Sequence, residues 1–180
     1  MPASNTPVSR RLNAYWRMEG ANVLFVPAIA LFAVWHLEDQ PTVAFGLAAT
    51  AACALLALGT LYWRAVWCRL NGRAAPFDYW IPFLARAEAA SIGLIGLASV
   101  AAAVDFWTAS QAWTPARIAT LILLLLAVLE YVNYYQIQLQ HFDNMADFRR
   151  MIAGKGFRRS QMARDIAKWR SRNRPTLRKR

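Results

Sequence analysis

The sequence predicts an all-α, polytopic membrane protein: an up-down bundle of four transmembrane helices followed by a short helical tail on the cytoplasmic side. Two observations predict this fold. The chain of 180 residues is 57% hydrophobic, and its apolar residues gather into four long runs that lack the two-residue alternation of a membrane β-barrel. Basic residues cluster at one side of each run, as the positive-inside rule describes.

Each run is long enough for a helix to cross the hydrocarbon core of a bilayer, which takes about 20 mostly apolar residues. Pro41 separates the first two runs, Gly72 marks a turn between the second and third, and Pro115 is suited to the first turn of the fourth. The predicted spans are residues 20–37, 42–67, 82–107 and 115–139.

The spans divide the chain into three parts: an N-terminal segment (1–19), the bundle (20–140) and a basic tail (141–180). Thirteen of the 21 Lys and Arg residues follow the fourth span, and the two connections on the other side carry none. We therefore expect both termini in the cytoplasm. The first 19 residues lack the apolar core of a secretory signal peptide. The Ala- and Arg-rich composition indicates a bacterial source, hence the inner (plasma) membrane.

Three ionisable residues well inside the predicted spans, Arg64, Glu88 and Glu130, fall in the cytoplasmic half of the bilayer. A charge at the centre of a membrane helix costs about 2.5–3.5 kcal/mol on insertion scales, so such residues are expected to be paired or functional. Glu130 is the most informative, because polar residues follow it at spacings that keep one broad helix face. The predicted intramembrane cluster consists of Arg64, Glu88, Glu130, Asn133 and Gln136.

Two interpretations of this cluster stay open. In the first, Glu130 binds a cation, a proton or a polar ligand group in a small cavity open to the cytoplasm. In the second, Glu130 pairs with Arg64 and the amides form hydrogen bonds across helices, at about 0.6–2 kcal/mol per contact. The near balance of charges favours the second interpretation.

No metal site, cofactor or catalytic residue is expected. Cys53 and Cys68 form no C-x-x-C motif. His36 and His141 fall on opposite sides of the membrane, so one chain cannot hold a haem between them. The sequence contains no H-E-x-x-H, G-x-S-x-G or phosphate-binding loop motif.

The tail holds 13 basic and 3 acidic residues. One short helix is predicted near Asn144, and a second from Ser160, with Met162, Ile166 and Trp169 on one side. A basic helix beside a membrane span is suited to anionic lipid headgroups or an acidic partner, whereas nucleic acid is disfavoured because forty residues leave little core for a recognition helix. A charge run that only fixes topology is the simpler alternative. The predicted binding residues are Arg158, Arg159, Arg164, Lys168, Trp169, Arg170 and Arg172.

The best-supported function is a non-catalytic membrane scaffold, assembly or regulatory component, acting as a homo-oligomer or within a larger complex. Two alternatives remain. One is a small transporter or channel subunit that uses Glu130. The other is a lipid-acting membrane enzyme with Glu130, Tyr134 and His141 as acid–base groups.

Overall fold

The computed structural model describes residues 6–109, 113–139 and 158–173. Within these ranges the chain forms five helices and no strand: α1 (Pro7–His36), α2 (Val43–Leu70), α3 (Ala75–Thr108), α4 (Pro115–Tyr135) and α6 (Gln161–Asn173). The first four are long and apolar enough to cross a membrane. The predicted all-α fold with four transmembrane helices is confirmed, and the chain is a multi-pass membrane protein.

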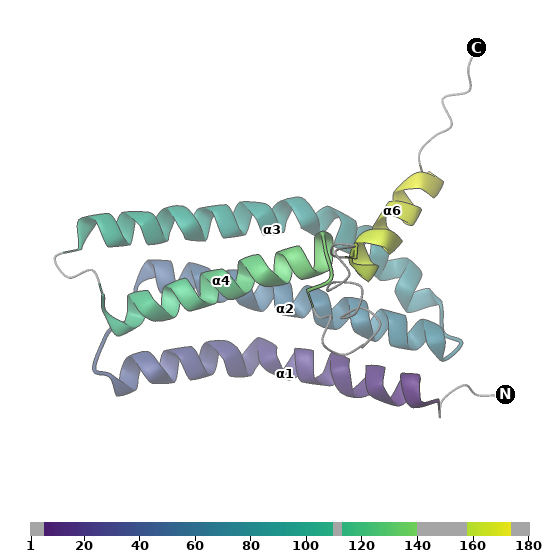
Figure 1. Cartoon of the computed structure of the whole chain (residues 1–180), viewed down its shortest axis with the longest axis horizontal. Coiled ribbons are helices and arrows are strands. Elements are labelled where there is room, and N and C mark those ends of the chain that lie inside the picture. Colours follow the sequence, from purple (N-terminus) through teal and green to yellow (C-terminus); the bar gives the residue numbers. More distant parts are fainter. Residues whose placement is uncertain (1–5, 110–112, 140–157, 174–180) are drawn as a thin grey trace, which may run out of the picture.

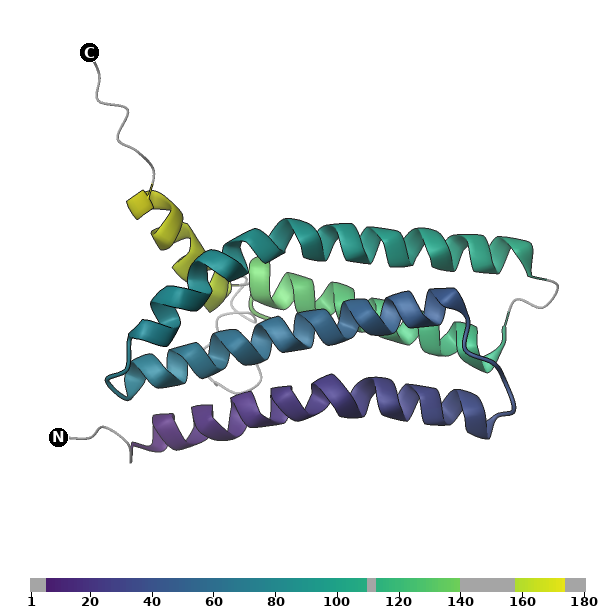
Figure 2. The ribbon, with the colours of Figure 1, turned by 180° about the vertical axis from the view of Figure 1, so that it is seen from behind.

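The four long helices run up and down beside one another, and α2 occupies the centre of the bundle (Figure 1 and Figure 2). α2 packs against α1, α3 and α4, and 50% of its apolar membrane-spanning stretch is buried, compared with 11% for that of α1. We call the two ends of the bundle the α6 end, where α1 begins and α2 joins α3, and the far end, where α1 joins α2.

α1 begins at Pro7, well before the predicted first span at residue 20. Thr6 caps it, because its Oγ1 accepts a hydrogen bond from the backbone N–H of Ser9 (3.2 Å), and Pro7 occupies the first turn. Both residue types are favoured at these positions. Because α1 begins at this cap, it includes a polar stretch before the apolar run. This stretch places Glu19 in the bundle.

Two other helix boundaries also differ from the prediction. α3 begins at Ala75, before the predicted residue 82, and Pro82 lies inside it. Figure 2 shows α3 changing direction in its first part, as expected for a helix that contains a proline. α4 ends at Tyr135, so the predicted end at residue 139 is wrong. The chain there leaves the helix to pair with the segment before α6.

This pairing holds the start of α6 against the end of α4. Ile137 and Arg159 form an isolated antiparallel bridge, and the backbone N–H of Ser160 donates to the carbonyl of Gln136 (3.0 Å). The Ser160 hydroxyl donates to the carbonyl oxygen of Tyr134. α6 therefore begins directly after Ser160, where a tail helix was predicted. The other tail helix, predicted near Asn144, lies outside the described residues.

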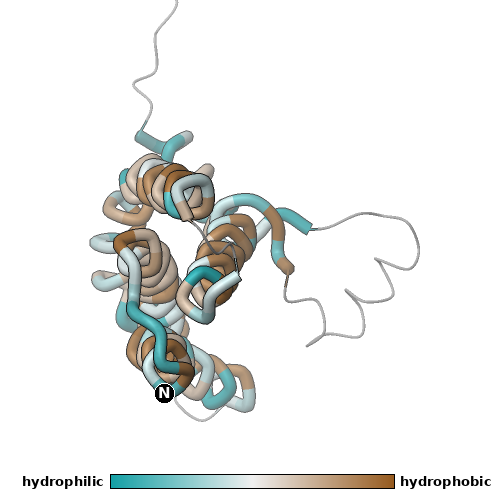
Figure 3. Tube along the Cα trace, turned by 90° about the vertical axis from the view of Figure 1, so that its left-hand side faces the viewer, coloured by the Kyte–Doolittle hydropathy of each residue, from teal (hydrophilic) through white to brown (hydrophobic). Residues whose placement is uncertain are grey.

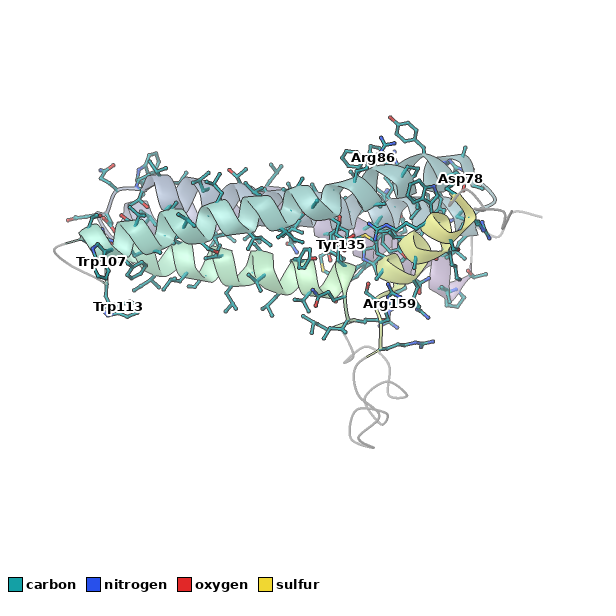
Figure 4. The ribbon with its side chains drawn as sticks, turned by 90° about the horizontal axis from the view of Figure 1, so that it is seen from above. Asp78, Arg86, Trp107, Trp113, Tyr135 and Arg159 are labelled. Atoms are coloured by element: carbon teal, nitrogen blue, oxygen red, sulfur yellow. The ribbon has the colours of Figure 1, made fainter. Side chains whose placement is uncertain are left out.

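Large apolar side chains are exposed along the long helices of the bundle, for example Phe25, Val100 and Ile122. Figure 3 shows hydrophobic residues along these helices and hydrophilic residues in α6. Trp107 and Trp113, which are 91% and 68% exposed, lie at the far end, opposite Asp78 and Arg159 (Figure 4). Tyr79 is 70% exposed near the start of α3. Aromatic side chains near both ends are typical of the two membrane–water interfaces.

Asp39 links the connection between α1 and α2 to the start of α4 at the far end. One carboxylate oxygen accepts a hydrogen bond from the backbone N–H of Ala116 in the first turn of α4 (2.8 Å), and the other accepts from Gln40 N–H (2.8 Å). The hydrogen bond from Ala116, above all, lowers the pKa of Asp39 from its ordinary value of 3.8. A negative charge at the N-terminus of a helix is stabilising.

We expect Asp39→Asn to destabilise the bundle at neutral pH by about 0.3–1 kcal/mol, the usual size of such a charge effect at an exposed helix end. The pKa of Asp39 is lowered on folding, so its contribution is present above the ordinary pKa and is lost as the pH falls through the lowered value. Thermal unfolding in detergent at neutral and acidic pH measures this. The gap between wild type and variant should close in acid, whereas Glu38→Gln should have little effect. Equal losses in both variants would contradict the assignment.

Candidate functional site

The predicted intramembrane residues do not all come together. Arg64 is exposed, and its guanidinium lies 5.9 Å from the ring centroid of Trp16. Glu88 forms an ion pair with Arg170 of α6, with 2.7 Å between Oε2 and Nη2. Within the described ranges neither Arg64 nor Glu88 pairs with Glu130, so the predicted Arg64–Glu130 ion pair is not formed.

The polar residues that follow Glu130 also separate. Asn133 remains on α4 close to Glu130, and its Oδ1 accepts a hydrogen bond from the backbone N–H of Leu139 (3.0 Å). Gln136 caps the end of α4 and is exposed. The predicted helix face is therefore cut short after Asn133.

Glu130 instead faces a second carboxyl, that of Glu19 on α1. The two carboxyls are close enough for their charges to interact. Glu130 Oε2 is buried and has no hydrogen-bond partner among the described residues. The carboxyl also lies beside the hydroxyl of Tyr134, one turn further along α4. We call Glu19, Glu130 and Tyr134 the carboxyl cluster.

Glu19 is only 3% exposed, and its carboxyl lies beside the hydroxyls of Tyr15 and Tyr134. Its Oε2 has no hydrogen-bond partner in the described parts of the chain. Glu19 was not among the predicted site residues, because it falls just before the apolar run. Its spacing does carry a signal: Leu12 and Val26, seven residues to either side, pack against the core, so Glu19 occupies the buried face of α1.

A glycine on α2 makes room for the carboxyl cluster. A Cβ added at Gly59 would overlap the hydroxyl and ring of Tyr134, with only 2.8 Å to its Cε2. Tyr134 is 2% exposed, and its hydroxyl has no hydrogen-bond partner among the described residues. Trp63, one turn along α2, packs edge-on against Tyr15 (5.4 Å between centroids), and its buried Nε1 is also unpartnered.

Among the described residues, four buried polar atoms without hydrogen-bond partners thus lie in the region where α1, α2 and α4 meet. Buried polar groups are nearly always hydrogen-bonded, and a buried carboxylate without a partner is strongly unfavourable. Two like-charged carboxyls side by side favour uptake of a proton or binding of a cation. The cluster has the chemistry of a site for a small positive charge.

A second polar site lies at the α6 end, where α6 docks onto the bundle. Met162 and Ile166 of α6 are buried (1% and 3% exposed). The hydroxyl of Tyr62, which is fully buried, donates a hydrogen bond to Asp165 Oδ2 (2.9 Å), and the Arg69 guanidinium lies 3.8 Å from the same oxygen. The apolar side of α6 is therefore covered by the bundle, and its basic side remains outside.

A polar pocket of about 360 Å³ lies between α6 and the facing parts of α2 and α3. Basic side chains line it together with Trp169 and two carboxylates, so three cationic groups oppose two anionic ones. We call it the basic pocket. Its charged and aromatic lining comprises Arg69, Phe77, Asp78, Asp165, Lys168, Trp169 and Arg172.

Three of the seven predicted lipid-binding residues line the basic pocket, namely Lys168, Trp169 and Arg172. The others lie elsewhere. Arg170 binds Glu88 and the carbonyl of Ala85, and Arg164 donates to Gln161 (3.1 Å). Arg158 and Arg159 are exposed beside the bridge to α4. His141, invoked for a lipid-acting enzyme, lies outside the described residues.

No protein-family model, curated protein or solved structure matches the chain.

Proposed function

We propose that this protein is a non-catalytic component of a bacterial inner membrane whose α6 end binds anionic lipid headgroups on the cytoplasmic side. The observation that carries the proposal is the basic pocket, which combines an opening of about 360 Å³ with cationic side chains from α2 and α6. A lipid phosphate is a compact anion that such groups recognise through charge-assisted hydrogen bonds.

The distribution of charge supports this orientation. The α6 end carries the basic residues of the start of α1, of the α2–α3 connection and of α6. At the far end the single basic residue near the connections, Arg117, forms an ion pair with Asp105 (3.0 Å). Excess Lys and Arg mark the cytoplasmic side of inner-membrane proteins. Both termini are then cytoplasmic.

Two side chains in the basic pocket are available for a ligand. Lys168 and Arg172 are exposed, and neither forms a side-chain hydrogen bond or ion pair in the part of the chain that the structure describes. Of the two carboxylates, Asp165 is already occupied by Tyr62 and Arg69. Basic groups near an anionic membrane surface contribute about 1 kcal/mol each.

We expect the double variant Lys168→Gln and Arg172→Gln to lose phosphatidylglycerol selectively. Removal of two such charges is worth about 2 kcal/mol, or roughly a thirtyfold loss of affinity. The measurement is native mass spectrometry of protein taken from bilayers that mix phosphatidylglycerol with phosphatidylcholine. Added salt should weaken retention in the wild type more than in the variant.

A matched control removes two charges from exposed arginines outside the basic pocket, Arg10→Gln and Arg86→Gln. It should keep wild-type retention of phosphatidylglycerol. Equal losses in the two double variants would show that net charge alone attracts the lipid, and unchanged retention in both would overturn the proposal.

A further inference from the structure

We infer that the carboxyl cluster of Glu19, Glu130 and Tyr134 binds one monovalent cation, a proton or Na⁺, inside the membrane-spanning bundle. This site is separate from the basic pocket and does not depend on lipid binding there. It gives the bundle a second function that the fold alone does not imply.

The charges around the cluster call for a positive ligand. From α1, Glu19 and Tyr15 face it; from α4, Glu130 and Tyr134 do. α2 contributes Trp63 and the space beside Gly59 that Tyr134 occupies. Arg64 of α2 does not face the cluster, because it is exposed and lies against Trp16. No ion pair within the described residues neutralises either carboxyl. Two adjacent carboxylates in a low-dielectric region cannot both stay ionised without a positive charge between them.

Tyr134 provides an independent indication of a ligand. Tyr134 is only 2% exposed. Its hydroxyl lies beside both carboxyls and has no hydrogen-bond partner among the described residues. Buried tyrosine hydroxyls usually have a hydrogen-bond partner of good geometry, which a bound ligand would supply here. A hydroxyl and two carboxyls supply oxygen ligands, which suit a proton shared between oxygens or a hard cation such as Na⁺.

A small cavity lies beside Tyr134 of the carboxyl cluster, on the side of α6. This cavity of about 20 Å³ lies between the bundle and the start of α6, and its lining includes the cluster residue Tyr134, the adjacent Trp63 and Asn133, and Ser160 and Gln161 beside α6. This volume is enough for one water molecule, and the lining offers several polar partners. Water in this cavity would lie beside Tyr134 and the start of α6.

The test is infrared spectroscopy of the full chain in liposomes, titrated from acid to alkaline pH in KCl and, at the same ionic strength, in NaCl. Apart from the signal of the other carboxyls, wild type should show a carbonyl-stretch component of the protonated buried pair that disappears on titration, and this component is the band followed in the variants. Its midpoint should fall by about one pH unit or more in Glu19→Gln and in Glu130→Gln, because the repulsion between the two carboxyls is gone. The double variant should lose this band.

Glu88→Gln is the matched control, since it removes a carboxyl of the bundle that is paired with Arg170, and it should leave the band unchanged. A midpoint that NaCl lowers in wild type but not in either single variant identifies Na⁺ as a ligand; a midpoint that ignores NaCl identifies the proton alone. Wild-type titration in both single variants would overturn the inference, whatever the result of the lipid-retention experiment. The single variants keep the test decisive if the double variant does not fold.

Discussion

Gly59→Ala is expected to destabilise the bundle by about 1–3 kcal/mol, the usual cost of inserting a methyl group where no space exists. The added Cβ would overlap the Tyr134 ring, which is wedged between α2 and the two carboxyls. Tyr134 sits on α4 beside the bond from Ser160 to its own carbonyl, so its displacement also disturbs the start of α6. The measurement is the apparent melting temperature in detergent, which should fall by about 2–4 °C for each kcal/mol.

Gly46→Ala provides the matched control, because Gly46 lies on the same helix and an added Cβ there meets nothing within 4 Å. Alanine has the higher helix propensity by about 0.8–1 kcal/mol, so this variant should be neutral or slightly more stable. A Gly59→Ala protein as stable as Gly46→Ala would show that Tyr134 can move without cost, and would remove the argument that α2 is shaped around the carboxyl cluster.

The sequence was sufficient to predict the four spans, because membrane insertion leaves a signal in composition alone. Hydropathy predicted a span over residues 42–67, which is close to the observed bounds of α2, Val43–Leu70. It missed the start of α1 and the first turns of α3, where polar residues continue the helix beyond the apolar run. Such extensions depend on capping and on contacts with neighbouring helices, which a window average does not contain.

The candidate sites were harder to predict, because they depend on which helix faces turn toward each other. Glu130 could be selected since a carboxylate inside an apolar run is conspicuous. Its neighbour could not: Arg64 has the right depth, but it points outward from α2, whereas Glu19 lies outside the apolar run and points inward. The same limit applies to Glu88, whose partner Arg170 is 82 residues further along the chain.

The docking of α6 onto the bundle was also hard to predict from the sequence. The spacing of Met162 and Ile166 does indicate one apolar side of α6, but periodicity does not say whether lipid or protein covers that side. The structure places both residues in the core of the bundle. What decides the docking is a set of polar contacts, with Asp165 at their centre, that join residues about a hundred positions apart.

Asp165→Ala is expected to release α6, because it leaves the buried hydroxyl of Tyr62 without an acceptor. An unsatisfied buried donor costs about 1–3 kcal/mol, so the undocked population should rise about 5- to 150-fold. The measurement is the rate at which a thiol reagent modifies Met162→Cys, a buried position of α6, after Cys53 and Cys68 are replaced by serine. The rate follows the undocked population when docking is fast compared with modification.

A double-mutant cycle with Tyr62→Phe separates this contact from a general effect of charge. With both partners removed no donor is left unsatisfied, so the double variant should be modified more slowly than the sum of the two single effects predicts. Asp78→Ala removes the other carboxylate of the basic pocket, which has no bond to Tyr62, and should leave the rate near that of the wild type. Additive effects, or a release of α6 by Asp78→Ala as large as that by Asp165→Ala, would show that Tyr62 and Asp165 do not hold the helix. Release of α6 should also separate Lys168 and Arg172 from Arg69, because only the docked helix brings these three side chains to one pocket.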